Sequence, residues 1–153
     1  MDIKYINPFL EATFSVLKQF GMADVKRGRL LKKEKMQVDL DITSVISTVG
    51  QVRGNIALSM SESTAKGIVS TMMMGMPVEA IDEIAISAIG EFTNMITGSA
   101  AVIFSQNELF VDATPPSVIS AQDVFFIISS VETLAIDIET PHGKIEMNIG
   151  LEM

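Results

Sequence analysis

The chain has no cysteine among its 153 residues. It can form neither a disulfide framework nor a thiolate metal site, and we expect it to lie in the cytoplasm. Histidine occurs once, as His142 in a Pro-His-Gly sequence that is typical of a turn. A single turn histidine gives no basis for a Ser-His-Asp or Cys-His arrangement, so we expect no catalysis of that kind.

Basic residues are also scarce: Lys and Arg number 11 against 19 Asp and Glu, which gives a formal net charge of −8. A chain with this balance lacks the cationic field that phosphate backbones and anionic lipids require. Its first residues do not show the basic and apolar regions of a signal peptide. We therefore expect no nucleic-acid partner, no membrane partner and no export.

One apolar stretch, from Ile84 to Phe104, raises the question of a membrane span. Its only charge is Glu91, near the centre, where a carboxylate in a bilayer would cost a few kcal/mol. The flanking residues are acidic, and no nearby Lys or Arg would orient a span. We expect this stretch to be a helix of a water-soluble domain.

The length fits one domain over residues 1–153, and a composition of 48% hydrophobic and 20% charged residues predicts a folded core. The patterns predict three helices. The first begins with Asn7 as N-cap and Pro8 in the first turn, and ends at Gly21. The second runs from Ser61 to Met74, and the third from about Ala80 to Phe104. Methionines 72–74 and 76 could form an adaptable binding patch, but we expect them to fill the core at the end of the second helix.

Strands are predicted in two groups around the helices. A basic cluster at residues 26–35 is a solvated loop or an edge strand, and the alternation over 36–42 is typical of a half-buried strand. Residues 43–49 and 52–60 form a hairpin, with Ile56, Leu58 and Met60 on one face. Further strands are predicted at 118–120, 124–129, 131–139 and 144–152, with residues 140–143 as a hairpin turn and Pro115-Pro116 in a loop.

The two best hairpins resemble each other, since residues 53–58 align with residues 142–147. Either any two amphipathic hairpins share such a pattern, or the chain contains a duplication. In the second case we expect an α+β fold, with one antiparallel or mixed sheet built from two similar hairpins and long helices packed on it.

The third helix places its polar residues along one line. At about 100° per residue, one set falls within about 40° of that line: Glu83, Ser87, Glu91, Asn94, Gly98, Ala101 and Ser105. The opposite side holds Ala85, Ile89, Phe92, Ile96 and Ile103. If the helix buries this apolar side, it must expose the four residues that we call the polar stripe: Ser87, Glu91, Asn94 and Gly98.

The centre of the polar stripe combines a carboxamide and a carboxylate three residues apart. The carboxamide of Asn94 has a donor and an acceptor, so it can hold a water molecule in a fixed line toward an electrophile. The carboxylate of Glu91 can pair with a lysine or arginine of a docking partner. An exposed Glu-x-x-Asn is also typical of the wet face of any amphipathic helix, so the pattern alone does not assign a function.

Three segments carry a resemblance to a known family. They are Ile-Asn-Pro-Phe-Leu-Glu-Ala-Thr at residues 6–13, the sequence from Gly54 to Ser61, and Ser-Ala-Ile-Gly-Glu-Phe-Thr-Asn-Met-Ile-Thr-Gly-Ser-Ala at residues 87–100. Together they resemble the CheC/CheX/FliY family of chemotaxis phosphatases, whose signature is Ser/Asp-x-x-x-Glu-x-x-Asn. The likeness spans nearly the whole chain.

The resemblance implies an enzyme that hydrolyses the aspartyl phosphate of a CheY-type response regulator. Asn94 would orient the attacking water, Glu91 would contact the regulator's lysine, and Ser87, Gly98 and Glu83 would contact the partner. Mg²⁺ would belong to the regulator, and we expect no cofactor or metal on this chain, whose sequence shows no suitable cluster of ligands.

The resemblance also implies one site per chain and a homodimer. Glu91 and Asn94 form the only Glu-x-x-Asn in the sequence, whereas CheC-like relatives carry a second copy on the first helix. Here the residue three positions after Glu11 is Phe14, which is expected to face the core. A chain with one site resembles the CheX branch of the family, whose members form dimers by pairing of their sheet edges.

Two other functions remain open. One is a non-catalytic adaptor that binds a response regulator or a flagellar motor component through the same helix. The other is a structural domain in which the polar stripe only packs against another helix.

Overall fold

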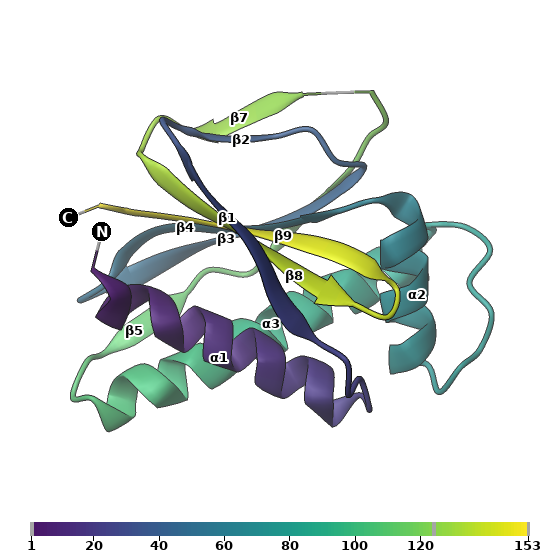
Figure 1. Ribbon diagram of the computed structural model, residues 1–153, viewed down its shortest axis with the longest axis horizontal. Coiled ribbons are helices and arrows are strands. Elements are labelled where there is room, and N and C mark those ends of the chain that lie inside the picture. The colour runs from purple at the N-terminus through teal and green to yellow at the C-terminus, as the bar shows by residue number, and fades with distance from the viewer. Residues whose placement is uncertain (1, 124, 153) are drawn as a thin grey trace.

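The computed structural model, which describes residues 2–123 and 125–152, contains a seven-stranded sheet between a pair of long helices and a two-stranded ribbon (Figure 1). In chain order the elements are α1 (Ile3–Gln19), β1 (Lys26–Lys33), β2 (Met36–Val38), β3 (Ile42–Gly50), β4 (Arg53–Met60), α2 (Glu62–Met72), α3 (Glu83–Gln106), β5 (Val111–Ala113), β6 (Ser117–Ser120), β7 (Phe126–Ser129), β8 (Thr133–Thr140) and β9 (Gly143–Glu152). Helices α1 and α3 lie side by side below the sheet, and β2 and β7 form the ribbon above it. The expected α+β class is confirmed.

The sheet is built from the two predicted hairpins, β3–β4 and β8–β9, which meet through an antiparallel pairing of β4 with β9. Strand β1 extends the sheet beside β8, while β5 and β6 pair with successive parts of β3. The alignment that places Arg53 on His142 also places Leu58 on Met147, and these last two residues are direct register partners. The resemblance between the hairpins therefore coincides with a local twofold arrangement about the Leu58–Met147 pair.

The main core lies between this sheet and the two long helices. Alternate residues of β4 and β9 are fully buried there, including Ile56, Leu58 and Met147. Phe9 of α1 and Phe104 of α3 meet edge to face, with their ring centroids 5.3 Å apart. Helix α3 is thus fixed against both α1 and the sheet, which leaves only its outer face free to bear a site.

The predicted start of the first helix is wrong. Helix α1 begins at Ile3, and the side chain of its N-cap Asp2 accepts a hydrogen bond from the backbone N of Lys4, at 3.1 Å. Pro8 lies inside the helix, where its missing N–H removes one backbone hydrogen bond. The predicted end is confirmed: Gly21 has φ +82°, and the N–H of Met22 donates to the carbonyl of Leu17, as in a Schellman motif.

The strand predictions need three corrections. The alternation over 36–42 belongs to two elements, because β2 leaves the sheet to pair with β7 and β3 begins only at Ile42. Strand β4 is buried on both faces, with Ala57 and Ser59 as inaccessible as Leu58. The short strand β5 was not predicted. The basic cluster is the edge strand β1 rather than a loop, and Val124 of the predicted strand 124–129 lies outside the described residues.

The methionines after α2 divide into two pairs. Met72 and Met73 are partly buried against the core, as expected, but Met74 and Met76 are exposed. The helix ends at Met72, and Met74 and Gly75 both have positive φ, so the chain turns away from the core at this point. His142 lies in the β8–β9 turn, as expected, where its Nε2 lies 2.8 Å from Oγ1 of Thr71 on α2.

No helix in the described part of the chain is long and apolar enough to cross a membrane. In α3 this follows from the composition of its outer face, which interrupts the apolar stretch with Glu91 and Asn94.

Candidate functional site

Helix α3 is held in register by its cap and by its buried face. The side chain of Asp82 accepts a hydrogen bond from the backbone N of Ala85 at 2.9 Å, which satisfies one free donor of the first turn. Ala85, Ile89, Phe92 and Ile96 are buried, and Ile103 is half-buried, as the helical spacing predicts.

A polar contact below the site ties the middle of α3 to the sheet. Thr93 Oγ1 donates to the carbonyl of Ile89 at 2.9 Å and lies 2.7 Å from Oγ of Ser44 in β3. Thr93 has a single hydroxyl hydrogen, so the Ser44 hydroxyl must be the donor in the contact between them. Both side chains are buried. The sequence analysis missed this pair, since a threonine beside a polar stripe gives no sign that it faces inward.

The opposite face of α3 exposes the polar stripe. Ser87, Glu91, Asn94 and Gly98 are all exposed, and so is Glu83 one turn before Ser87. Within residues 2–123 and 125–152, the side chains of Glu91 and Asn94 make no hydrogen bond and no ion pair. Apart from the backbone bonds of the helix, the only hydrogen bond at Asn94 among the described residues is donated by Thr97 Oγ1 to its backbone carbonyl, at 3.1 Å. Both functional groups are therefore available to a partner, and no helix of the described chain covers them.

Small residues keep the surroundings of Asn94 open. A Cβ added at Gly98 would have no heavy atom within 4 Å outside its own helix. On the other side, Gly90 is buried, and a Cβ there would lie 3.6 Å from Pro116 and 3.8 Å from Val118, after β5. The Pro115-Pro116 loop thus borders α3 near Glu91, a neighbour that the sequence analysis did not predict.

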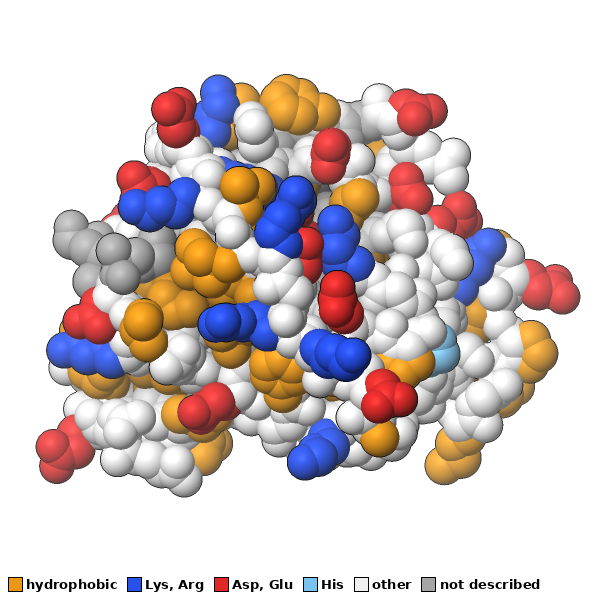
Figure 2. All heavy atoms as spheres, in the orientation of Figure 1, with side chains coloured by type: hydrophobic (Ala, Val, Ile, Leu, Met, Phe, Trp, Pro, Cys, Tyr) orange, Lys and Arg blue, Asp and Glu red, His pale blue; other side chains and the backbone are white. Residues whose placement is uncertain are grey.

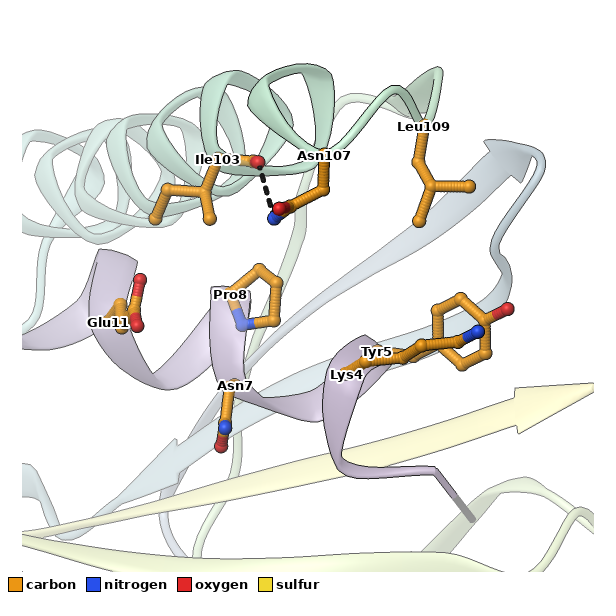
Figure 3. Close-up of a pocket in the computed structure, with 8 residues that line it drawn as sticks. All are labelled: Lys4, Tyr5, Asn7, Pro8, Glu11, Ile103, Asn107 and Leu109. Carbon is orange, nitrogen blue, oxygen red and sulfur yellow. Dashed lines mark hydrogen bonds between the residues drawn. The ribbon is translucent and has the colours of Figure 1, made fainter.

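The hollow drawn in Figure 3 does not belong to this surface. It encloses about 400 Å³ between α1 and the end of α3, and is lined by Lys4, Tyr5, Asn7, Pro8, Glu11, Ile103, Asn107 and Leu109. Ile103 lies half a helical turn away from Asn94, so the hollow and the polar stripe face in different directions. The polar stripe is a raised helix face, which suits a macromolecular partner better than an enclosed small molecule.

Among the described residues, no three potential His, Cys, Asp or Glu ligands come together as a metal site. The stripe itself contributes one carboxylate and one carboxamide, with Glu83 two turns before Glu91. Such a set can position water and bind a cation, but it contains no nucleophile activated by a neighbouring base.

Helix α1 carries no matching pair. Glu11 is exposed, but Phe14, three positions later, is half-buried and packs against the core. The polar stripe on α3 is therefore the one surface of the described chain that presents a Glu-x-x-Asn pair.

Comparison with known proteins finds one family throughout. The family model for the chemotaxis phosphatase CheX matches residues 42–139. The CheY-P phosphatase CheX of Thermotoga maritima is 32% identical over 124 residues, which cover 81% of this chain and 80% of that protein. The chemotaxis protein CheX of Desulfovibrio desulfuricans has a TM-score of 0.85 at 26% identity, covering 97% of this chain and 99% of that one.

A further structural match is the CheX of Borrelia burgdorferi, solved as a CheX–CheY–BeF3–Mg²⁺ complex. Its TM-score is 0.77 at 24% identity, with 99% of this chain and all of that chain covered. At this identity the match shows the fold that the two chains share.

Proposed function

This chain belongs to the chemotaxis phosphatase CheX family, and from that membership we propose that it removes the phosphoryl group from the aspartyl phosphate of a CheY-type response regulator. The observation that carries the proposal is the free presentation of Glu91 and Asn94, three residues apart on the exposed face of a helix whose other face is fixed in the core. The proposal includes a cytoplasmic setting, where response regulators act.

In the proposed reaction the regulator supplies the reacting group and this chain positions the water. The side chain of Asn94 enters the regulator's active site, where its carboxamide accepts from and donates to the attacking water without changing its own charge. Water attacks phosphorus opposite the aspartyl oxygen, the phosphorus–oxygen bond to the aspartate breaks, and inorganic phosphate and the free carboxylate are released. No covalent intermediate forms on this chain.

Glu91 has the docking role in this proposal. Its carboxylate pairs with a lysine of the regulator, and this contact fixes the register in which Asn94 approaches the phosphoryl group. Ser87, Gly98 and Glu83 contact the regulator along the same face. Gly98 contributes by its lack of a side chain, because the space beyond it is open.

We further propose that Mg²⁺ is bound by the regulator. The Borrelia burgdorferi complex contains CheY, BeF3 and Mg²⁺ together with CheX, so a metal accompanies the partner in that assembly. In the proposal, Glu91 docks the regulator and Asn94 positions the water. The Mg²⁺ on the regulator neutralises the charge of the phosphoryl oxygens.

Replacement of Asn94 by alanine tests the catalytic role. With a response regulator of the same cell, phosphorylated by acetyl phosphate, the wild-type protein should accelerate phosphate release, and Asn94→Ala should abolish most of this acceleration. Regulator binding, measured by isothermal titration calorimetry, should stay within about threefold, because one positioning group is lost and not the interface.

The same assay separates the proposal from the adaptor alternative. An adaptor for a regulator or a motor component would bind without accelerating phosphate release, so neither the wild type nor Asn94→Ala would show activity. Glu91→Ala should instead weaken binding, and the weakening should shrink as salt is raised. Equal binding by Glu91→Ala and the wild type would contradict the docking role.

A homodimer paired through sheet edges is part of the same proposal. Light scattering coupled to gel filtration should give twice the mass of one chain at micromolar concentration. A monomer under these conditions would contradict the dimer and leave the phosphatase proposal untouched.

A further inference from the structure

The basic residues of this acidic chain are concentrated in one segment. Six of its eleven Lys and Arg lie within residues 26–35, which contain a single acid, Glu34. The rest of the chain holds five basic and eighteen acidic residues. Figure 2 shows the result as Lys and Arg side chains gathered over the middle of the face where Figure 1 draws β1. The protein therefore presents one positive surface on an otherwise negative body.

This positive surface is a sheet edge. Strand β1 pairs with β8 on one side, and on its other side the described chain provides no partner strand. Exposed sheet edges commonly carry lysines and bulges that prevent unwanted pairing, and the register of β1 does shift between Arg27 and Leu30. Protection alone would explain the charges at this edge.

Two exposed leucines on β1 are not explained by protection of the edge against unwanted pairing. Leu30 is 52% exposed and Leu31 is 42% exposed, so the edge offers apolar side chains on both faces of the strand. Exposed leucines on an open strand favour pairing with another chain. The combination of leucines and cations points to an added strand that is apolar at some positions and acidic at others.

A hollow of about 450 Å³ lies beside β1, on the face of the sheet below the β2–β7 ribbon. Its apolar lining includes Leu31, Leu40 and Phe125. Its charged lining consists of three cations, Arg29, Lys33 and Lys144, and two carboxylates, Asp39 and Glu146, of which Glu146 is paired with Lys33. Arg29, Leu31 and Lys33 alternate along β1 and so point to the same face. A strand added beside β1, about 4.8 Å away, would direct every second side chain toward this hollow.

The cations differ in how strongly they are already engaged. Lys33 Nζ is saturated, with Glu146 Oε1 and Asn148 Oδ1 at 2.8 Å and the carbonyl of Gln37 at 2.9 Å. Arg29 makes only a 3.7 Å contact with Asp137, and its side chain is 66% exposed. Arg27 is exposed and has no ion pair among the described residues. Lys33 therefore maintains the hollow, while Arg27 and Arg29 are available to a ligand.

We propose that the β1 edge and the adjoining hollow bind an acidic, extended peptide segment that adds to the sheet as a strand and inserts an apolar side chain into the hollow. Main-chain hydrogen bonds to β1 supply affinity, and the cations and the hollow select the sequence. A second copy of β1 is a poor occupant, because self-pairing would oppose the five cations of one strand with the five of the other. This binding site is separate from the α3 surface and does not depend on its proposed function.

The experiment uses the full chain and a defined probe. A fluorescein-labelled peptide of about ten residues alternating glutamate with leucine is titrated with protein while anisotropy is recorded, and a peptide with lysine in place of glutamate serves as its counterpart. We expect saturable binding of the acidic peptide only, weakening as NaCl is raised from about 50 to about 300 mM. Hydrogen exchange should show protection of the β1 amides in the bound state.

Charge reversal identifies the surface. The double variant Arg27→Glu/Arg29→Glu should raise the dissociation constant about tenfold or more, because these are the two exposed cations of β1 that are available to the ligand. The double variant Lys18→Glu/Arg53→Glu makes the same change in net charge at exposed positions elsewhere and should bind as the wild type does. Leu31→Ser, a smaller change, should also weaken binding, and circular dichroism checks the fold of each variant.

Several results would overturn the proposal. They are absence of saturable binding, equal binding of the lysine peptide, binding without protection of β1, and tighter binding of anionic vesicles or duplex DNA at the same cations. A change of oligomeric state in Arg27→Glu/Arg29→Glu with unchanged peptide affinity would also overturn it, since the edge would then pair with a second copy.

Discussion

Replacing Thr93 by valine probes the contact that fixes the site helix to the sheet. Valine has nearly the shape of threonine but no hydroxyl, so the change removes polar contacts while leaving the packing of α3 intact. In the wild type, the Ser44 hydroxyl donates to Thr93 Oγ1 over 2.7 Å, and Thr93 donates to the carbonyl of Ile89 over 2.9 Å. After the change, the buried Ser44 hydroxyl has lost this acceptor.

The expected loss follows from burial. Ser44 is inaccessible and Thr93 is 2% exposed, so water does not replace the lost partner. A buried donor left unsatisfied costs about 1–3 kcal/mol, whereas the Ile89 carbonyl keeps its place in the helical ladder. For a domain of this length, about 2 kcal/mol corresponds to a fall in Tm of roughly 4–8 °C. Urea unfolding followed by circular dichroism measures the free energy, and a thermal scan measures Tm.

The double variant Ser44→Ala/Thr93→Val provides the internal control. Removing both partners leaves no orphaned hydroxyl, so the double variant should be more stable than Thr93→Val alone. If Thr93→Val loses less than about 0.5 kcal/mol, or if the double variant loses the sum of the two single changes, the hydrogen bond does not fix α3 as the geometry indicates.

Three further predictions concern neighbouring features. Gly98→Leu should leave the free energy of unfolding unchanged or raise it by up to about 1 kcal/mol, since leucine favours the helix and the space beside Gly98 is open. The same substitution should raise the KM for the phosphorylated regulator, and an unchanged KM would place the interface elsewhere. Lys33→Met should destabilise the protein by about 1.5–3 kcal/mol in urea unfolding, because it leaves the half-buried Glu146 opposite Asp137 without the cation to which it is hydrogen-bonded. Glu146→Gln in the same chain should restore part of the loss. Asp82→Ala should cost about 1 kcal/mol through loss of the α3 cap; Asp82→Asn, which keeps an acceptor, should lose less.

The elements with strong local signals were predicted well. The spacing of apolar residues located α3 within three residues at either end, and the turns at Gly50-Gln51 and at residues 140–143 located both hairpins. These features depend on residues near each other in the chain, so they can be predicted from the local sequence. The exposed polar stripe follows for the same reason, since a helix that buries Phe92 and Ile96 must expose Glu91 and Asn94.

The wrong predictions of helix and strand positions have a common cause, because each of these elements depends on contacts with distant parts of the chain. Asn7-Pro8 has the local signal of a helix start, but Asp2 caps an earlier turn and Ile6 is buried with it. The alternation over 36–42 continues evenly through the sequence, yet β2 pairs with β7, about ninety residues away in the chain, and β3 with β4. Strand β4 is buried on both faces because helices lie on one side of the sheet and the β2–β7 ribbon on the other, an arrangement that the sequence of β4 does not reveal (Figure 1).

The residues of α3 that stabilise the fold and those that we propose for the chemistry lie on opposite faces of the helix. One face contributes Ile89, Phe92 and Ile96 to the core, and the hydroxyl of Thr93 attaches the helix to β3. Substitutions on the exposed face should therefore change activity without unfolding the chain. This separation makes the phosphatase proposal testable with single residues: loss of phosphate release in Asn94→Ala at unchanged stability assigns the loss to the carboxamide. An Asn94→Ala variant that unfolds more easily than the wild type would show that the two faces are coupled, and the argument from geometry would fail.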